Sequence, residues 1–187
     1  MKLSKDYQYH VLCEDVQMRA FIQAVLAEHD VGSGKIRFSN CPPGKGCGEA
    51  FVKRELPREI EILHATNYNR KVLIVCTDAD RFKVDERIRQ LENEVKSQRL
   101  KWNRSAELVV LWVPKREIET WIHFLQGEQV DEETSCRHSG RPVSCKKEAT
   151  LFSKYCQDIE EIDCSMVPSL MNAKQEYVRV CRLQKQQ

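Results

Sequence analysis

Two aspartates stand two residues apart directly after a long apolar run. The run covers residues 71–76, and Asp78 and Asp80 follow it. Apolar side chains on both faces are typical of a strand buried on both sides, as in a parallel sheet covered by helices. Ligands of such sheets bind beyond the carboxyl ends of the strands, where carboxylate oxygens suit Mg²⁺. The pattern predicts a metal site, although Asp in this place can also simply form a turn or cap a helix.

A second acid occupies the same place after another predicted strand. Residues 6–13 form a strand-like run rich in aromatic and apolar side chains, which ends at Glu14 and Asp15. Because the carboxyl ends of parallel strands lie at one edge of a sheet, Glu14 is expected beside Asp78 and Asp80. Asp15 either adds a further acid to this site or is the N-cap of the next helix.

Acids that converge in this way can support phosphodiester cleavage. One or two cations neutralise the charge on phosphate oxygens and bring a water molecule in line. Asp78 and Asp80 are the expected metal ligands, and Glu14 either bridges the metals or acts as general base. Glu119, which follows the fourth predicted strand, is a candidate ligand for a second metal. Its alternative interpretation is a surface glutamate beside a buried Trp121, and Glu117 is a weaker substitute.

Basic residues near these acids are candidate contacts to nucleic-acid phosphates. Lys45 lies in a loop rich in glycine and proline, Lys53 follows that loop, and Lys115 and Arg116 follow the fourth predicted strand. Arginine and lysine commonly contact phosphates, but surface lysines and arginines often serve solubility alone. The Gly-Lys pair in the loop lacks the spacing of a phosphate-binding loop.

The composition bounds the possible classes of protein. The chain has 187 residues, of which 41% are hydrophobic, enough for one domain with a small appendage. Lysine and arginine (30) nearly balance aspartate and glutamate (28), so the net charge of +2 argues neither for nor against nucleic acid. The sequence contains no apolar run near the length of a membrane span and no apolar core of a signal peptide, so we expect a cytoplasmic protein.

The chain contains nine cysteines and five histidines, residue types that can bind metals or act in catalysis. Without a Cys-x-x-Cys pair, a zinc site built from Cys136, His138 and Cys145 is less favoured than free thiols; Cys156 and Cys164 are further candidates for such a site. The sequence assigns no acid partner to His10, His64 or His123, which favours structural or solvated roles for them.

Strands and helices alternate along most of the chain. Strands are expected at residues 6–13, 35–39, 71–76 and 108–113, and helices at 18–26, 84–95 and 115–125. Two helical pieces separated at Pro57 are expected over residues 49–64, and Arg87 is placed on the exposed face of its helix. This order predicts an α/β fold with a mainly parallel, doubly wound sheet of about four strands flanked by helices.

The C-terminal part is expected to be a small helical extension. Residues 131–147 have the composition of a polar loop, and two short helices are predicted at 148–156 and 167–183. We therefore divide the chain into an α/β domain at 1–127 and, at 128–187, a loop plus helices that pack on the same domain.

The order of these parts resembles the Toprim (Rossmann-like) fold of topoisomerases, bacterial primases and overcoming-lysogenization-defect nucleases. The likeness covers residues 7–127, and it is closer to small stand-alone Toprim-like proteins of prokaryotes, in which a Glu-x-Trp helix like that at 119–121 follows the fourth strand. It implies that Glu14 is the acid of the first motif and that Asp78 and Asp80 bind the metal. Asp15 departs from the glycine usual in the family.

The same resemblance implies a function and partners. It suggests a nuclease that depends on Mg²⁺ or Mn²⁺, acts on DNA or RNA and serves antiviral defence together with an ABC-type or related ATPase. The alternative is a catalytically inactive Toprim-like module that binds and regulates the ATPase. These readings differ in whether the acids still hold a metal.

Overall fold

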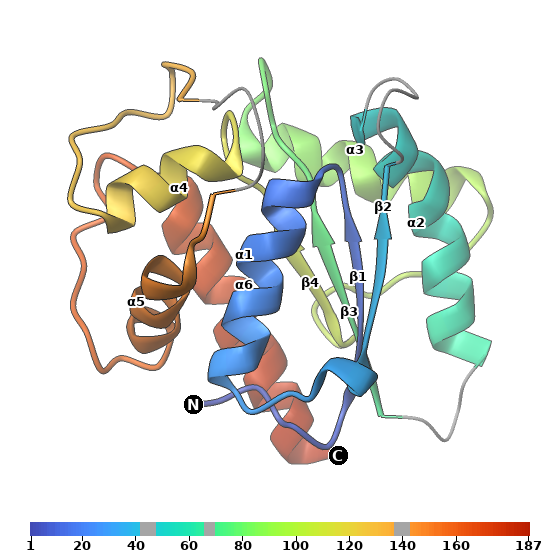
Figure 1. The fold of residues 1–187 in the computed structure, drawn as a ribbon. Coiled ribbons are helices and arrows are strands. Elements are labelled where there is room, and N and C mark those ends of the chain that lie inside the picture. Colours follow the sequence, from blue (N-terminus) through green and yellow to red (C-terminus); the bar gives the residue numbers. More distant parts are fainter. Residues whose placement is uncertain (42–47, 66–69, 137–142) are drawn as a thin grey trace.

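The computed structural model describes residues 1–41, 48–65, 70–136 and 143–187. The chain forms an α/β fold around a four-stranded sheet in which every strand pair is parallel (Figure 1). The order across the sheet is β2-β1-β3-β4. The strands are β1 (Gln8–Cys13), β2 (Ile36–Asn40), β3 (Lys71–Cys76) and β4 (Val109–Trp112).

The register of the strands aligns their carboxyl ends. Cys13 at the end of β1 pairs with Asn40 of β2 and with Cys76 of β3, and Cys76 pairs with Trp112 of β4. Residues that follow these strands therefore emerge at one edge of the sheet. Both chain termini lie at the opposite, amino end of the strands (Figure 1).

Helices cover both faces of the sheet (Figure 1). One face carries α1 (Val16–Glu28), α4 (Ile118–Leu125), α5 (Lys146–Cys156) and α6 (Pro168–Gln186). The other carries α2 (Gly48–Ala65) and α3 (Val84–Ser97). Alternate residues of the central strand serve the two cores, with Ile74 in the first and Leu73 and Val75 in the second. The expected doubly wound arrangement and the burial of β3 on both sides are thus confirmed.

The prediction of two helical pieces around Pro57 is wrong. Residues 48–65 form one continuous helix, α2, with Pro57 inside it. Proline removes one backbone hydrogen bond from a helix. The turns on both sides are held by burial, because Val52, Leu56 and Ile60 all lie in the core against the sheet. Packing of one apolar stripe thus keeps the helix intact through the proline.

The C-terminal helices are longer than expected and pack closely against the α/β domain. α5 packs on α1, and α6 lies along the edge strand β4. Glu176 of α6 accepts a hydrogen bond from the Leu111 backbone N–H at 3.2 Å, and Arg179 donates to the carbonyls of Glu107 (2.9 Å) and Val109. These side chains satisfy the outer backbone groups of β4 and so protect the edge against pairing with another chain.

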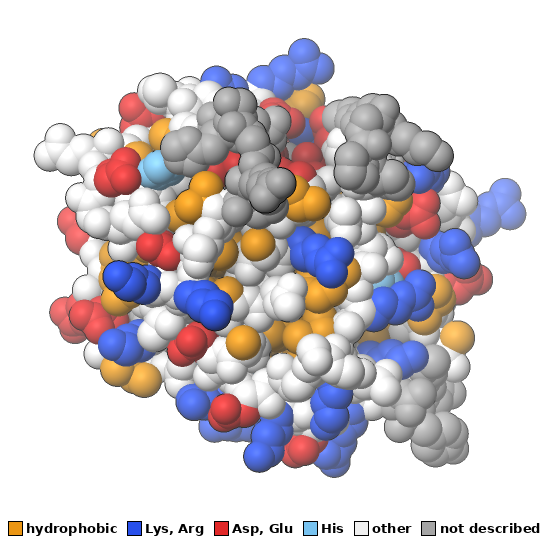
Figure 2. Space-filling model, viewed as in Figure 1, with side chains coloured by type: hydrophobic (Ala, Val, Ile, Leu, Met, Phe, Trp, Pro, Cys, Tyr) orange, Lys and Arg blue, Asp and Glu red, His pale blue; other side chains and the backbone are white. Residues whose placement is uncertain are grey.

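The surface is mixed in charge. On the face that carries α1, basic and acidic side chains are interspersed, in keeping with the nearly balanced composition (Figure 2). Among the described helices, none is long and apolar enough to cross a membrane.

Candidate functional site

The Glu14 carboxylate lies against the end of β3. Its Oε1 accepts a hydrogen bond from the Thr77 hydroxyl and another, at 3.0 Å, from the backbone N–H of Asp78. Glu14 follows β1 and Asp78 follows the neighbouring strand β3, so the sheet brings the two acidic segments together at one edge. Both bonds end on Oε1. Within the part of the chain that the structure describes, Oε2 receives no hydrogen bond, so it is the oxygen available to a cation or a proton.

Burial changes the acidity of Glu14. Removal from water raises its pKa to about 7, although the hydrogen bonds from Thr77 and Asp78 work against that rise. The nearby Asp80 carboxylate raises the pKa further, whereas Arg87 lowers it. A carboxyl group with such a pKa can gain or lose a proton near neutral pH, which suits a general base.

The two aspartates after β3 differ in their surroundings. Asp78 is buried, whereas 52% of the Asp80 side chain is exposed. Asp80 has a φ of +53°, in the left-handed region, and Lys115 Nζ donates to its carbonyl oxygen at 3.0 Å. The turn interpretation therefore holds for the backbone of Asp80, while its carboxylate stays accessible at the sheet edge.

The first residue of α2 packs directly on Glu14. A Cβ atom at Gly48 would lie 2.7 Å from Glu14 Cβ and 3.0 Å from the Glu14 carbonyl oxygen. The 2.7 Å contact is too close for a larger residue unless the chain shifts at Gly48 or Glu14. Gly48 thus allows α2 to begin against the acid that ends β1.

Arg87 overturns one prediction. It was placed on the exposed face of its helix, but its side chain is 0% exposed. The guanidinium donates to Glu49 and to Gln90 Oε1 (2.8 Å), and its Nη2 lies 3.8 Å from Asp80 Oδ2. Position 87 lies in the first turn of α3, beside the turn after β3, where Glu49 and Asp80 compensate the buried charge.

Glu49 is the main counter-charge of Arg87. Partial burial raises its pKa, but hydrogen bonds from Arg87 and Lys53 outweigh this, and the pKa of Glu49 is held below its usual value. Lys53 Nζ lies 2.5 Å from the same Oε1 of Glu49 that Arg87 contacts. One carboxylate therefore serves two cations.

Other acids near the strand ends have structural partners. Asp15 accepts hydrogen bonds from the backbone N–H groups of Gln17 and Met18, both at 2.9 Å, which confirms that it caps α1. Glu117 is buried and accepts from the Ser135 hydroxyl at 2.8 Å. It is thus tied to the segment after α4 and not to the acids of β1 and β3.

Glu119 is buried in the first turn of α4. The alternative that it is a surface glutamate is therefore wrong, although Trp121 is buried as expected. Its role as a second metal ligand stays a prediction.

The fit to a metal ion is good in donor type and partial in geometry. Glu14, Asp78 and Asp80 supply hard oxygen donors at adjacent strand ends, as Mg²⁺ requires. Across residues 1–41, 48–65, 70–136 and 143–187, however, no group of three or more acid, histidine or cysteine side chains forms a ready-made cage. The exposed Asp80 carboxylate, which pairs with Arg87, is the donor with room to move.

The candidate zinc ligands are not gathered either. Cys136 and Cys145 are free thiols outside any such group within the part of the chain that the structure describes. His138 lies outside the described residues.

The predicted nucleic-acid contacts separate into different environments. Lys115 is engaged with Asp80 and lies 3.6 Å from Glu133 Oε2. Arg116 lines an open pocket of about 460 Å³ next to Asp80. Lys45 lies outside the described residues.

Three histidines have acid partners that the sequence did not reveal. His10 Nδ1 lies 2.6 Å from Glu59 Oε2, and His64 and His123 each lie within 3.0 Å of a glutamate. These partners lie five to 49 residues away, and no local pattern identified them.

Comparison with family models, with curated proteins and with solved structures found no match to this chain. The functional argument therefore depends on the side chains at the carboxyl ends of the strands.

Proposed function

We propose that this chain is a Mg²⁺-dependent phosphodiesterase of the Toprim type that cleaves nucleic acid. The observation that carries the proposal is the contact of Glu14 with the end of β3, where its carboxylate meets Thr77 and Asp78. Acids distant in sequence thereby share the edge at which open parallel sheets bind their ligands. The burial of Asp78 and the raised pKa of Glu14 are typical of catalytic carboxyl groups.

The residues of the site have distinct roles in this proposal. Glu14, Asp78 and Asp80 hold Mg²⁺ or Mn²⁺, which when bound neutralises charge on the phosphate oxygens and activates water. With its pKa near 7, Glu14 can also accept a proton at Oε2. Lys115 fixes the backbone of the Asp80 turn by its hydrogen bond to the carbonyl. Glu119 remains the candidate for a second metal.

The setting of the activity is also part of the proposal. The order of the acids along the strands supports the resemblance to small Toprim-like nucleases that serve antiviral defence in the cytoplasm. On that basis the chain is an effector subunit controlled by an ATPase partner, and DNA and RNA are both candidate substrates.

Cleavage assays test the proposed activity. Labelled DNA and RNA are incubated with the protein and Mg²⁺ or Mn²⁺, with and without the candidate ATPase. Cleavage should require the metal and fall at least about 100-fold in Asp78→Asn and Glu14→Gln, because each change removes a ligand oxygen charge. Asp85→Asn, at an exposed acid in the first turn of α3, is the matched control and should cleave normally.

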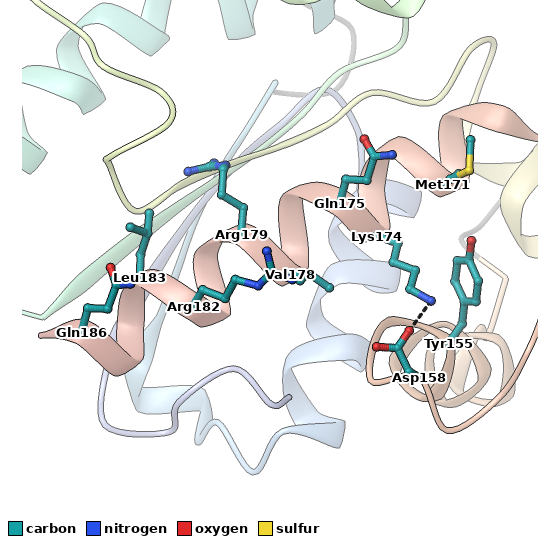
Figure 3. A pocket seen from close by; sticks show the side chains of 10 residues that line it. All are labelled: Tyr155, Asp158, Met171, Lys174, Gln175, Val178, Arg179, Arg182, Leu183 and Gln186. Carbon is teal, nitrogen blue, oxygen red and sulfur yellow. Dashed lines mark ion pairs between the residues drawn. The ribbon is translucent and has the colours of Figure 1, made fainter.

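A second candidate is an interaction module without catalysis. A pocket of about 700 Å³ runs along α6 and is bordered by the Lys174–Asp158 ion pair (Figure 3). Apolar side chains near this helix are unusually exposed, namely Ile159 (65%), Met166 (60%) and Met171 (45%). Exposed apolar groups of this kind are typical of protein-binding surfaces.

Metal binding separates the two candidates. Titration of the wild-type chain with Mn²⁺ should show binding that Asp78→Asn weakens if the chain is an enzyme. Wild-type protein that binds no metal and cuts neither DNA nor RNA, even with its ATPase partner, would establish the module instead.

A further inference from the structure

Cationic side chains outnumber acidic ones in the open pocket beside Asp80. It has a volume of about 460 Å³ and lies between α2, the turn after β3, the start of α3 and the segment after β4. Its charged lining residues are Lys53, Arg81, Arg87, Arg116, Glu49 and Asp80. Four cations face two carboxylates, so the pocket has a formal excess of two positive charges.

The cations of the pocket are held in place by other groups. Arg87 is fully buried, and within the described residues its Nε has no hydrogen-bond partner. The Arg81 and Arg87 guanidinium groups lie 5.2 and 5.1 Å from the centre of the same Phe82 ring. Arg116 is anchored through its Nε, which donates to the Glu133 carbonyl at 3.1 Å. Little side-chain entropy is then lost when an anion binds.

The charge and shape of the pocket suit a phosphate monoester. Arginine groups bind phosphate oxygens through paired N–H donors. A phosphate monoester carries about 1.5 to 2 negative charges near pH 7, which matches the excess of two, whereas each backbone phosphodiester carries only one. The volume is that of a small-molecule site and accommodates a terminal nucleotide.

The position of the pocket links it to the candidate active site. Asp80 borders the pocket, follows the same strand as Asp78 and is close enough to Glu14 to interact with it electrostatically. We propose that the pocket binds the terminal phosphate of a nucleic-acid strand, so that the chain acts at phosphorylated ends. This inference rests on the proposed phosphodiesterase function and specifies its substrate.

A binding experiment tests the pocket separately from catalysis. Fluorescence anisotropy of the full chain in EDTA compares three otherwise identical single-stranded oligonucleotides, which carry a 5′-phosphate, a 3′-phosphate or hydroxyl groups at both ends. One phosphorylated form should bind about tenfold more tightly than the hydroxyl form, and the two phosphorylated arms identify the end that is recognised. Inorganic phosphate should compete with that form selectively.

Variants at the rim of the pocket complete the test. Arg116→Gln and Lys53→Gln should abolish the preference for the phosphorylated end, because each removes a cation without emptying a buried position. Lys96→Gln, at an exposed lysine in the last turn of α3, should keep it. Equal binding of the three oligonucleotides, a preference unaffected by both rim variants, or no binding at all would overturn the inference.

Failure of the end-binding inference can be distinguished from failure of the proposed phosphodiesterase function. Asp78→Asn should lose cleavage but retain the end preference. If the protein prefers phosphorylated ends but never cleaves, the phosphodiesterase proposal is rejected and the phosphate-binding pocket is supported. If it cleaves without any preference for phosphorylated ends, the pocket proposal is rejected and the phosphodiesterase is supported.

Discussion

The two ends of the sheet bury polar groups of different kinds. At the carboxyl end, ionisable groups gather, with Glu14 and Arg87 both beside the turn after β3. At the amino end, near the chain termini, neutral groups bond to one another (Figure 1). There the Tyr9 hydroxyl donates to the Ser4 carbonyl at 2.8 Å and accepts from Gln184 at 3.1 Å.

The comparison separates structural polar groups from groups available to a ligand. At the amino end the Tyr177 hydroxyl donates to the Met1 carbonyl at 2.9 Å and lies 3.2 Å from His29 Nε2, so these contacts fasten α1, α6 and the N-terminus together. At the carboxyl end Asp80 is half exposed and borders an open pocket. Buried charge is costly unless it is compensated, so its concentration at an open edge favours a functional role.

Burial shifts the pKa values of one group at each end of the sheet in opposite directions. It raises the pKa of Glu14 to about 7 and lowers that of His29, with a smaller contribution from Lys2, to about 4. Both groups therefore prefer their neutral forms, but one is an acid and the other a base. The stability of the two ends should respond to pH with opposite sign.

The largest expected effect is at Arg87. Arg87→Met should lower the free energy of unfolding by about 3 kcal/mol, because it leaves Glu49 with Lys53 alone as counter-charge among the described residues and removes the contact with Asp80. Urea denaturation measures this change. Arg89→Met, at an exposed position of the same helix, is the control and should stay within about 0.5 kcal/mol of wild type. Equal effects of the two substitutions would mean that the buried ion pair is not important for stability.

Glu14 should make the protein less stable as the pH rises. Its folded pKa of about 7 exceeds the ordinary 4.5, so the folded state retains a proton that the unfolded state releases, and stability falls between these values. The loss is on the order of 3 kcal/mol for a shift of this size. Urea titrations in EDTA across this range compare Glu14→Gln with wild type and with Glu28→Gln, an exposed control. As the pH rises, the stability of Glu14→Gln relative to the other two proteins should increase by this amount. A Glu14→Gln protein with the pH dependence of wild type would refute the assignment.

His29 should act in the opposite sense and with a similar or smaller magnitude. Its folded pKa of about 4 lies below the ordinary 6.5, so stability is present above pH 6.5 and is lost as the pH falls toward 4. The two slopes oppose each other where their ranges overlap. His29→Gln should therefore uncover the decline due to Glu14, and Glu14→Gln the rise due to His29. If the two single variants shared one pH profile, the contrast between the ends would be wrong.

The smallest effect is expected at Tyr177. Tyr177→Phe removes the hydroxyl that donates to Met1 and contacts His29, at a cost of about 1 kcal/mol in unfolding free energy. Thermal or urea denaturation at pH 7 measures it. Nucleic-acid cleavage should be unchanged, since the hydroxyl lies in the neutral network, and a large loss of cleavage would show that the amino end takes part in function.

Much of the fold was predictable because its signals are local. The apolar runs of β1, β3 and β4 and the helical stripe of α3 each mark an element within a few residues, and the alternation of such elements favours a parallel sheet. The role of Pro57 was not predictable from its own propensity, because burial of the α2 stripe keeps the helix continuous. The local sequence indicates the conformational preference of a residue such as proline, whereas tertiary packing decides whether the helix continues through it.

The placement of the acids at the candidate site was predictable, and so was part of its basic lining, since Lys53 and Arg116 were candidate phosphate contacts, but the burial of Arg87 was not. A carboxylate directly after a buried strand has a place set by the strand itself, so Glu14 and Asp78 could be assigned to one edge. Arg87 looked like one more charge on an exposed helical face. Its burial depends on Glu49, which lies 38 residues away along the chain.

By itself the sequence determined the four strands, their parallel arrangement and the edge at which the acids emerge, because a strand covered on both sides requires apolar residues at successive positions. Only the tertiary structure decided that Glu14 receives hydrogen bonds from Thr77 and Asp78, more than 60 residues away, and that a cationic pocket adjoins Asp80. Such features depend on distances between segments that no local pattern of residues encodes. Hydrogen bonding and desolvation at those contacts then set the charge of the site.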